Sequence, residues 1–141
     1  MQPVRAFFVR PDVFPTEDSF TTWLMTALKA GGGEYHVLAS LPSAAPAPEN
    51  LGRGFIVLFV YKKRIIGEAV VRRYDKPPVN TPSDEESQAV VTFVNGSIRL
   101  FSPPVPADKI QGFPFTHGSP GVDWDIYHKI LAHLSESGSF V

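Results

Sequence analysis

Three side chains on one short apolar stretch have the chemistry to recognise a nucleobase. Ser97, Arg99 and Phe101 alternate along the stretch, so in a strand all three would project from the same face. A hydroxyl and a guanidinium can read the edge of a splayed base, and an aromatic ring can stack on it. The alternative is a half-exposed strand with Phe101 in the core and Arg99 paired to an acid. The pattern predicts a base-binding face and leaves a structural role open.

Positive charge is concentrated in one segment. Seven of the thirteen Lys and Arg residues lie between Arg53 and Lys76, although the formal net charge of the whole chain is -1. These side chains donate the charge-assisted hydrogen bonds that phosphates accept. Alternatively, they solvate a turn and protect strand ends, which suits Arg72 and Arg73 best. We predict that contacts to a nucleic-acid backbone come from Arg10, Arg53, Lys62, Lys63 and Arg64.

Four aromatic residues are candidates for the walls or rim of a base pocket. Phe8 and Trp23 flank the exit of the first predicted strand, and Tyr61 and Trp124 carry polar groups suited to a rim. Such a pocket needs aromatic walls and a few polar groups. The alternative is that Phe8 and Trp23 belong to the core and that Tyr61 and Trp124 are ordinary residues at the boundary between core and surface. The predicted base-binding residues are Phe8, Trp23, Tyr61, Ser97, Arg99 and Trp124.

Signals for catalysis are weaker. Glu68, inside an apolar run, has the chemistry of a general base, but such a residue more often pairs with an arginine. His117 precedes a serine and two aspartates, yet no Gly-x-Ser-x-Gly motif is present. His128 and His133 are five residues apart, which places them on different faces of a helix. The absence of cysteine excludes thiolate metal sites. Glu68 and His117 remain the catalytic candidates, and we expect no metal and no cofactor.

Length and composition indicate one globular domain over residues 1–141. The chain is 43% hydrophobic and 19% charged, which is typical of a folded protein with its own core. The near-neutral charge argues against a general electrostatic binder of nucleic acid and favours a local basic patch or help from a partner protein. No apolar run is long enough to span a bilayer, and the N-terminal residues lack a signal-peptide pattern. We expect a cytoplasmic protein with no membrane partner.

The stretch from Leu51 to Tyr74 predicts the hairpin around which the fold is organised. Residues 55–61 are apolar at both strand parities, which is typical of a central strand in a covered sheet or of a strand in a small barrel packed on its outside. A basic turn at 62–64 leads into a second strand at 65–71, although the Asn-Gly signal of a tight hairpin is missing. Gly67 inside the second strand indicates a bulge or a sharp bend.

The remaining segments predict an α+β domain. Further strands are expected at 5–10, 34–40, 89–94 and 97–101, the last two joined by Asn95-Gly96 as a strong hairpin signal. A helix at 20–29 would be capped by Thr16 or Asp18. A second helix at 123–134 follows Asp123 as a possible N-cap, and Ile126, Ile130 and Leu134 form its apolar stripe. The segments 41–50 and 75–88 are Pro-rich or polar loops.

Taken together, four segments resemble the PUA-like superfamily, and its ASCH and EVE branches in particular. They are residues 54–61 and 64–71, the stretch SIRLFSPPV at 97–105 and YHKIL at 127–131. The resemblance implies a pseudo-β-barrel of five or six strands flanked by helices. It also implies binding of RNA or DNA, often with a modified or flipped base in a pocket. Some ASCH proteins are enzymes with the pattern GxKxxExR, which this chain lacks.

Three functions follow as expectations. The first is a nucleic-acid-binding domain that holds a modified or flipped base in an aromatic-walled pocket. The second is an ASCH-like ribonuclease or amidohydrolase acting on RNA or a modified nucleoside, with Glu68 or His117 as the reactive group. The third is a protein-interaction module whose Pro-rich loops carry the contacts.

Overall fold

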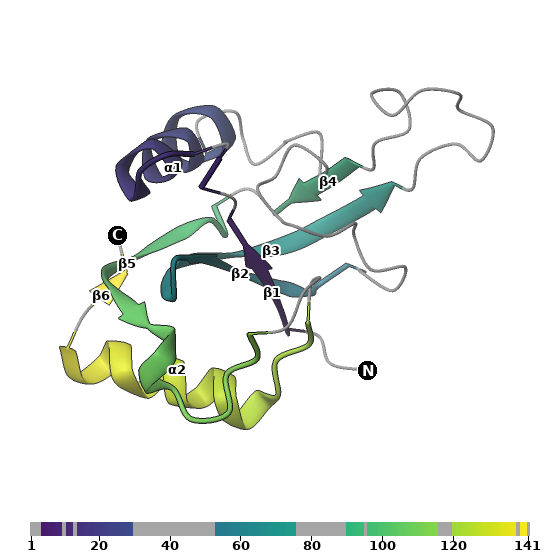
Figure 1. Ribbon diagram of the computed structural model, residues 1–141. Helices are drawn as coiled ribbons and strands as arrows, with labels where there is room; N and C mark the ends of the chain where they lie inside the picture. The colour runs from purple at the N-terminus through teal and green to yellow at the C-terminus, as the bar shows by residue number, and fades with distance from the viewer. Residues whose placement is uncertain are drawn as a thin grey trace.

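Strand β2 (Ile56–Tyr61) is an interior strand of the sheet in the computed structural model, which describes residues 4–9, 11–12, 14–29, 53–75, 90–94, 96–115, 120–137 and 139–140. It pairs in parallel with β1 (Val4–Phe8) and antiparallel with β3 (Arg64–Asp75). Antiparallel pairing continues from β3 to β5 (Arg99–Pro106) and on to β6 (Ser139–Phe140). The five strands thus follow the order β1-β2-β3-β5-β6, and β4 (Val90–Phe93) also pairs with β3. This mixed sheet and its helices make an α+β fold (Figure 1).

Helices cover both faces of the sheet (Figure 1). Helix α1 (Glu17–Trp23) and its π-helical continuation η1 (Leu24–Lys29) pack on one face, where Val57 and Phe59 of β2 join their core. Helix α2 (Trp124–Ser137) packs on the other face, where Leu58 and Val60 join a second core. Successive residues of a strand point to opposite faces. The two apolar parities of β2 therefore reflect two cores, as the sequence predicts for a central strand.

Both helices begin close to the predicted residues. Thr16 caps α1, because its side chain accepts the Ser19 N–H at 3.0 Å while the Ser19 hydroxyl accepts the Thr16 N–H at 3.2 Å. Helix α2 starts directly after Asp123 and buries Ile130 and Leu134 of the predicted stripe. A short 3-10 turn, η3 (Ala107–Lys109), directly follows β5. The predicted strand at 34–40 and both predicted loops fall almost wholly outside the described residues.

The predicted hairpin across Asn95-Gly96 is wrong. Strands β4 and β5 both run antiparallel to β3, β4 against Val71–Asp75 and β5 against Arg64–Glu68. The backbone groups of Val70 join them, since its carbonyl accepts the Val94 N–H at 2.8 Å and its N–H donates to the Ser97 hydroxyl at 3.0 Å. The two strands therefore follow one another along the same edge of β3 instead of pairing with each other.

Gly67 marks an irregularity in β3, as predicted. The pairing register shifts between Ile65 and Gly67 on the β5 side and between Phe59 and Val60 on the β2 side. A Cβ at position 67 would lie 2.3 Å from the Arg99 carbonyl oxygen, so only glycine allows the two backbones to approach this closely. The bulge bends β3 at the point where β5 crosses it.

The expected barrel is not formed. Among the described residues the sheet ends at β1 and β6, which do not pair with each other, so it is open. The physical reason is that α1 and α2 bury the two faces of β2, a task that a curled sheet would otherwise perform. None of the described helices combines the length and hydropathy needed to cross a bilayer.

Candidate nucleic-acid interface

The turn between β2 and β3 presents two lysines to solvent. Tyr61 pairs with Arg64, so Lys62 and Lys63 alone form the turn, and both have left-handed backbone angles, with φ of 46° and 65°. This is the type I′ geometry that Asn-Gly normally supplies, because the Cβ atom of most residues disfavours positive φ. Both lysines are exposed, and among the described residues neither pairs with a carboxylate. The turn therefore carries two uncompensated positive charges at a backbone cost.

An aromatic cluster lies at the same end of the sheet. Phe8 pairs with Val60, two residues or roughly 7 Å along β2 from Lys62. The Phe8 ring lies 6.5 Å from that of Phe115, which in turn lies 5.4 Å from Phe113. Phe113 is buried in the core beneath α2, but Phe115 is 49% exposed. We call Phe8, Lys62, Lys63, Phe113 and Phe115 the sheet-end surface.

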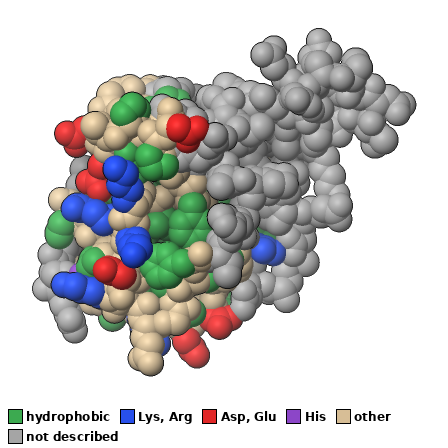
Figure 2. Space-filling view, viewed as in Figure 1, with side chains coloured by type: hydrophobic (Ala, Val, Ile, Leu, Met, Phe, Trp, Pro, Cys, Tyr) green, Lys and Arg blue, Asp and Glu red, His purple; other side chains and the backbone are tan. Residues whose placement is uncertain are grey.

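Figure 2 shows how the kinds of side chain are distributed over one face of the molecule. Hydrophobic side chains gather near the centre of the viewed face, and Lys and Arg side chains, with acidic ones between them, follow its left flank. The β2–β3 turn lies at the left of the same view (Figure 1). The sheet-end surface thus includes one exposed ring, Phe115, and two exposed lysines. Aromatic rings and cations together bind single-stranded nucleic acid by stacking and charge.

The other predicted backbone-binding residues lie elsewhere or are engaged. Arg64 follows the turn, but its Nε lies 3.0 Å from Oε1 of Glu17, so its charge is balanced. Arg53 precedes β2 at its opposite end, beside Gly54, whose N–H donates to Val71. The length of β2, roughly 20 Å, separates it from the lysine turn. Arg10 lies outside the described residues. The predicted groove thus reduces to Lys62 and Lys63.

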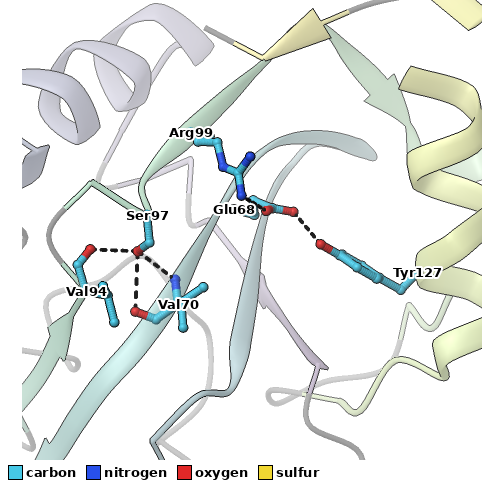
Figure 3. Close-up of polar contacts among 6 residues, drawn as sticks. All are labelled: Glu68, Val70, Val94, Ser97, Arg99 and Tyr127. Carbon is cyan, nitrogen blue, oxygen red and sulfur yellow. Dashed lines mark hydrogen bonds and ion pairs between the residues drawn. The ribbon is translucent and has the colours of Figure 1, made fainter. Parts of the chain in front are cut away.

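Glu68 is buried in a polar cluster beneath α2 (Figure 3). Only 2% of the residue is exposed; its Oε1 accepts the Tyr127 hydroxyl at 2.9 Å, and its Oε2 lies 3.6 Å from a guanidinium nitrogen of Arg99. Burial above all, then the charge and hydrogen bond of Glu68, raise the pKa of Tyr127 well above its usual range, while Arg99 opposes this. Tyr127 is therefore held as a neutral donor. Glu68 pairs with a neighbouring arginine, as its alternative interpretation predicts.

Ser97 has a structural task. Its hydroxyl accepts the Val70 N–H at 3.0 Å and lies 2.7 Å from the Val94 carbonyl, to which it donates (Figure 3). It thereby replaces a backbone acceptor where the edge of the sheet passes from β4 to β5. Arg99 leaves 46% of its side chain exposed above Glu68. Of the predicted polar pair, only Arg99 presents donors to solvent.

The predicted aromatic walls do not meet in one place. Trp23 packs against Phe14 and Phe20 at the edge of the core under α1. Tyr61 is 3% exposed, and its hydroxyl donates to the Phe14 carbonyl at 2.7 Å. Trp124 is 47% exposed on the first turn of α2, with its ring against Tyr127 and stacked on His128. Only Phe8 belongs to the sheet-end surface.

Phe8, Trp23, Tyr61 and Trp124, the predicted aromatic walls, line neither of two hollows formed by described residues. One, of about 200 Å³, is lined by Glu17, Asp18 and Thr21 of α1 and by residues of β3 and β5. The other lies between η3 and α2 and is described below. No group of three or more potential metal ligands occurs among the described residues. His117 falls outside them.

Phe115 and Tyr127 were not among the predicted site residues. Phe115 stands in the run Phe-Pro-Phe between η3 and α2, and its exposure is visible only in the structure. Tyr127 falls on the apolar stripe of α2, and a buried tyrosine hydroxyl needs an acceptor. The partner, Glu68, lies 59 residues away in sequence, so spacing alone did not identify the pair.

No family model, curated protein or solved structure matches this chain. The PUA-like relationship therefore stays a prediction.

Proposed function

We propose that the domain binds single-stranded nucleic acid at the sheet-end surface. Lys62 and Lys63 contact phosphates, and a base stacks on Phe115 beside Phe8. The observation that carries the proposal is the exposed Phe115 ring at the end of the sheet where two exposed lysines occupy left-handed backbone. Neither lysine has a carboxylate partner among the described residues, and Lys62 Nζ lies 5.8 Å from the centroid of the Tyr61 ring. Lysines held in a left-handed backbone conformation cost stability, so a role in binding explains Lys62 and Lys63 better than a role in stabilising the turn.

A near-neutral chain is compatible with this proposal because the charge is local. Arg64 and Arg99 face Glu17 and Glu68, so these two positive charges are balanced. The two turn lysines remain as the electrostatic contact, and stacking supplies a term that salt does not weaken. The resemblance to PUA-like domains supports the same class of ligand, including a modified or flipped base as the stacked group.

Catalysis by Glu68 has less support. Both of its oxygens face protein groups, Tyr127 and Arg99, and the residue is almost fully buried. A general base needs an oxygen within hydrogen-bond reach of substrate. The cluster instead joins α2, β3 and β5, which is a structural role.

The test is a fluorescence titration of short single-stranded RNA and DNA, with and without modified bases. Lys62→Gln/Lys63→Gln should weaken binding roughly tenfold at about 50 mM salt and lower the slope of log K against log salt by about 1.4, because two phosphate contacts are lost. Phe115→Ala should weaken binding roughly tenfold at any salt concentration, since stacking contributes about 1–3 kcal/mol per base.

The matched control is Arg72→Gln/Arg73→Gln, which makes the same charge change on exposed residues toward the far end of β3. Its affinity should stay within about twofold of the wild type. An equal loss in this control would show that only net charge matters. Absence of binding by the wild-type protein at low salt would refute the proposal.

A further inference from the structure

A basic hollow lies between η3 and α2. It encloses about 300 Å³ and is lined by Lys109, Ile110, Gln111, Lys129, Ala132 and His133. Its two lysines, Lys109 of η3 and Lys129 of α2, are twenty residues apart in sequence, and no carboxylate is among the described residues that line the space. Lys129 lies across part of it, with Nζ 3.4 Å from the Gln111 carbonyl. Both lysines are exposed. The chemistry of the lining suits an anion.

The hollow adjoins the sheet-end surface through η3. The Ala107 N–H donates to the Lys63 carbonyl at 2.8 Å, and Arg64 pairs with Pro106, so η3 begins against the lysine turn. Lys109 is two residues further along the chain, and Phe113 and Phe115 follow. The segment 107–115 thus borders the hollow at one end and the aromatic cluster at the other. Asp108, exposed on η3, is the acidic side chain that accompanies Lys109 there.

We infer that the hollow binds a phosphate of the same nucleic-acid strand, beyond the nucleotides held at the sheet-end surface. The inference rests on the proposed function and adds Lys109 and Lys129 to it. Three cationic positions then follow one another: the turn lysines, Lys109 on η3 and Lys129 on α2. A flexible single strand can follow such a track, because its backbone places a negative charge at every nucleotide. An isolated phosphate would gain only part of this energy.

The inference predicts a dependence on ligand length. Titrations would use single-stranded oligonucleotides from about 4 to about 16 nucleotides, the range of sites that single-strand binders occupy. Lys109→Gln/Lys129→Gln should bind the shortest ligands as the wild type does. For the longest, it should lose roughly fivefold to tenfold in affinity at about 50 mM salt, with a salt slope lower by about 1.4. Arg72→Gln/Arg73→Gln, with the same change of net charge, should show no length dependence.

The outcomes separate this inference from the proposed function. If the wild type binds and Lys62→Gln/Lys63→Gln weakens it, but Lys109→Gln/Lys129→Gln has no effect at any length, the hollow is not a phosphate site. An equal loss at every length would also overturn the inference, because the hollow would then belong to the first contact. If the wild type binds no oligonucleotide, the proposed function itself fails. Circular dichroism melts of each variant establish that folding is intact.

Discussion

Two short turns of this chain behave oppositely to their sequences. Asn95-Gly96 has the residues of a tight hairpin, and Lys62-Lys63 does not. Yet Lys62-Lys63 forms the two-residue hairpin, with both residues in the left-handed region. At the other turn, the Ser97 N–H donates to the Val94 carbonyl across Gly96, which has a φ of 83°, and the chain continues along β3. The Asn-Gly sequence, which usually joins two strands in a tight hairpin, therefore does not do so here.

The difference teaches that strand burial overrides local turn preference here. β2 and β3 place buried apolar residues in both cores, so pairing them secures both faces of the sheet. That gain exceeds a turn cost of about 1–2 kcal/mol per left-handed residue. β4 is short, and both it and β5 have a better partner in β3 than in each other, because β3 offers twelve residues of edge. The turn at Gly96 therefore does not join β4 and β5 in a hairpin.

The largest expected effect comes from a substitution at Gly67. The pairing of β5 with β3, which replaces the expected hairpin, requires the two backbones to lie close together at this residue. In Gly67→Ala the new Cβ would meet the Arg99 carbonyl at 2.3 Å, and backbone must move. We expect a loss of about 3 kcal/mol in the free energy of unfolding, measured by urea denaturation. Gly54→Ala is the control, because Gly54 has a φ of 87° with open space around it and should cost about 1 kcal/mol. Equal losses would mean that close β3–β5 contact is not what Gly67 provides.

The sequence predicted those features that depend on short, local patterns of residues. The two-sided β2, the bulge at Gly67, the Thr16 cap and the stripe of α2 follow from periodicity and capping chemistry. Pairing between distant segments could not be predicted from local patterns. The second hairpin was wrong because β4 and β5 both pair with β3. The barrel was wrong because the sheet stays open, with helices on both of its faces.

The predicted site residues are scattered over the structure for a related reason. Ser97 has a reactive side chain, but its partners are the backbone atoms of Val70 and Val94, which no side-chain pattern reveals. Phe8 and the turn lysines were predicted separately, and only the register of β1 on β2 brings them to one end of the sheet. Residue types indicated the chemistry, and strand order decided which of them meet.

The second-largest effect should come from Ser97, because its hydroxyl holds the edge together where the expected hairpin is absent. Ser97→Ala leaves the Val70 N–H without its acceptor, which should cost about 2 kcal/mol of unfolding free energy. Amide exchange should show faster exchange at Val70 and Val94. Ser102→Ala, exposed on β5, is the matched control and should change stability by less than about 0.5 kcal/mol. An unchanged unfolding free energy in Ser97→Ala would mean that Gly96 and the strands stabilise this edge without the Ser97 hydroxyl.

The smallest effect tests the turn lysines directly. Placing an Asn-Gly sequence in the β2–β3 turn by Lys62→Asn/Lys63→Gly should raise the free energy of unfolding by about 1 kcal/mol, because Asn and Gly accept the left-handed angles more readily. Lys62→Gln/Lys63→Gln removes the same charges without relieving the backbone, so its stability should remain near that of the wild type. Both variants should lose nucleic-acid affinity equally. A gain in stability for the first variant alone, with equal loss of binding, would show that the lysines occupy this turn for contact with a ligand. Equal stabilities would show that the left-handed lysines impose no cost, and the argument from strain to function would lose its basis.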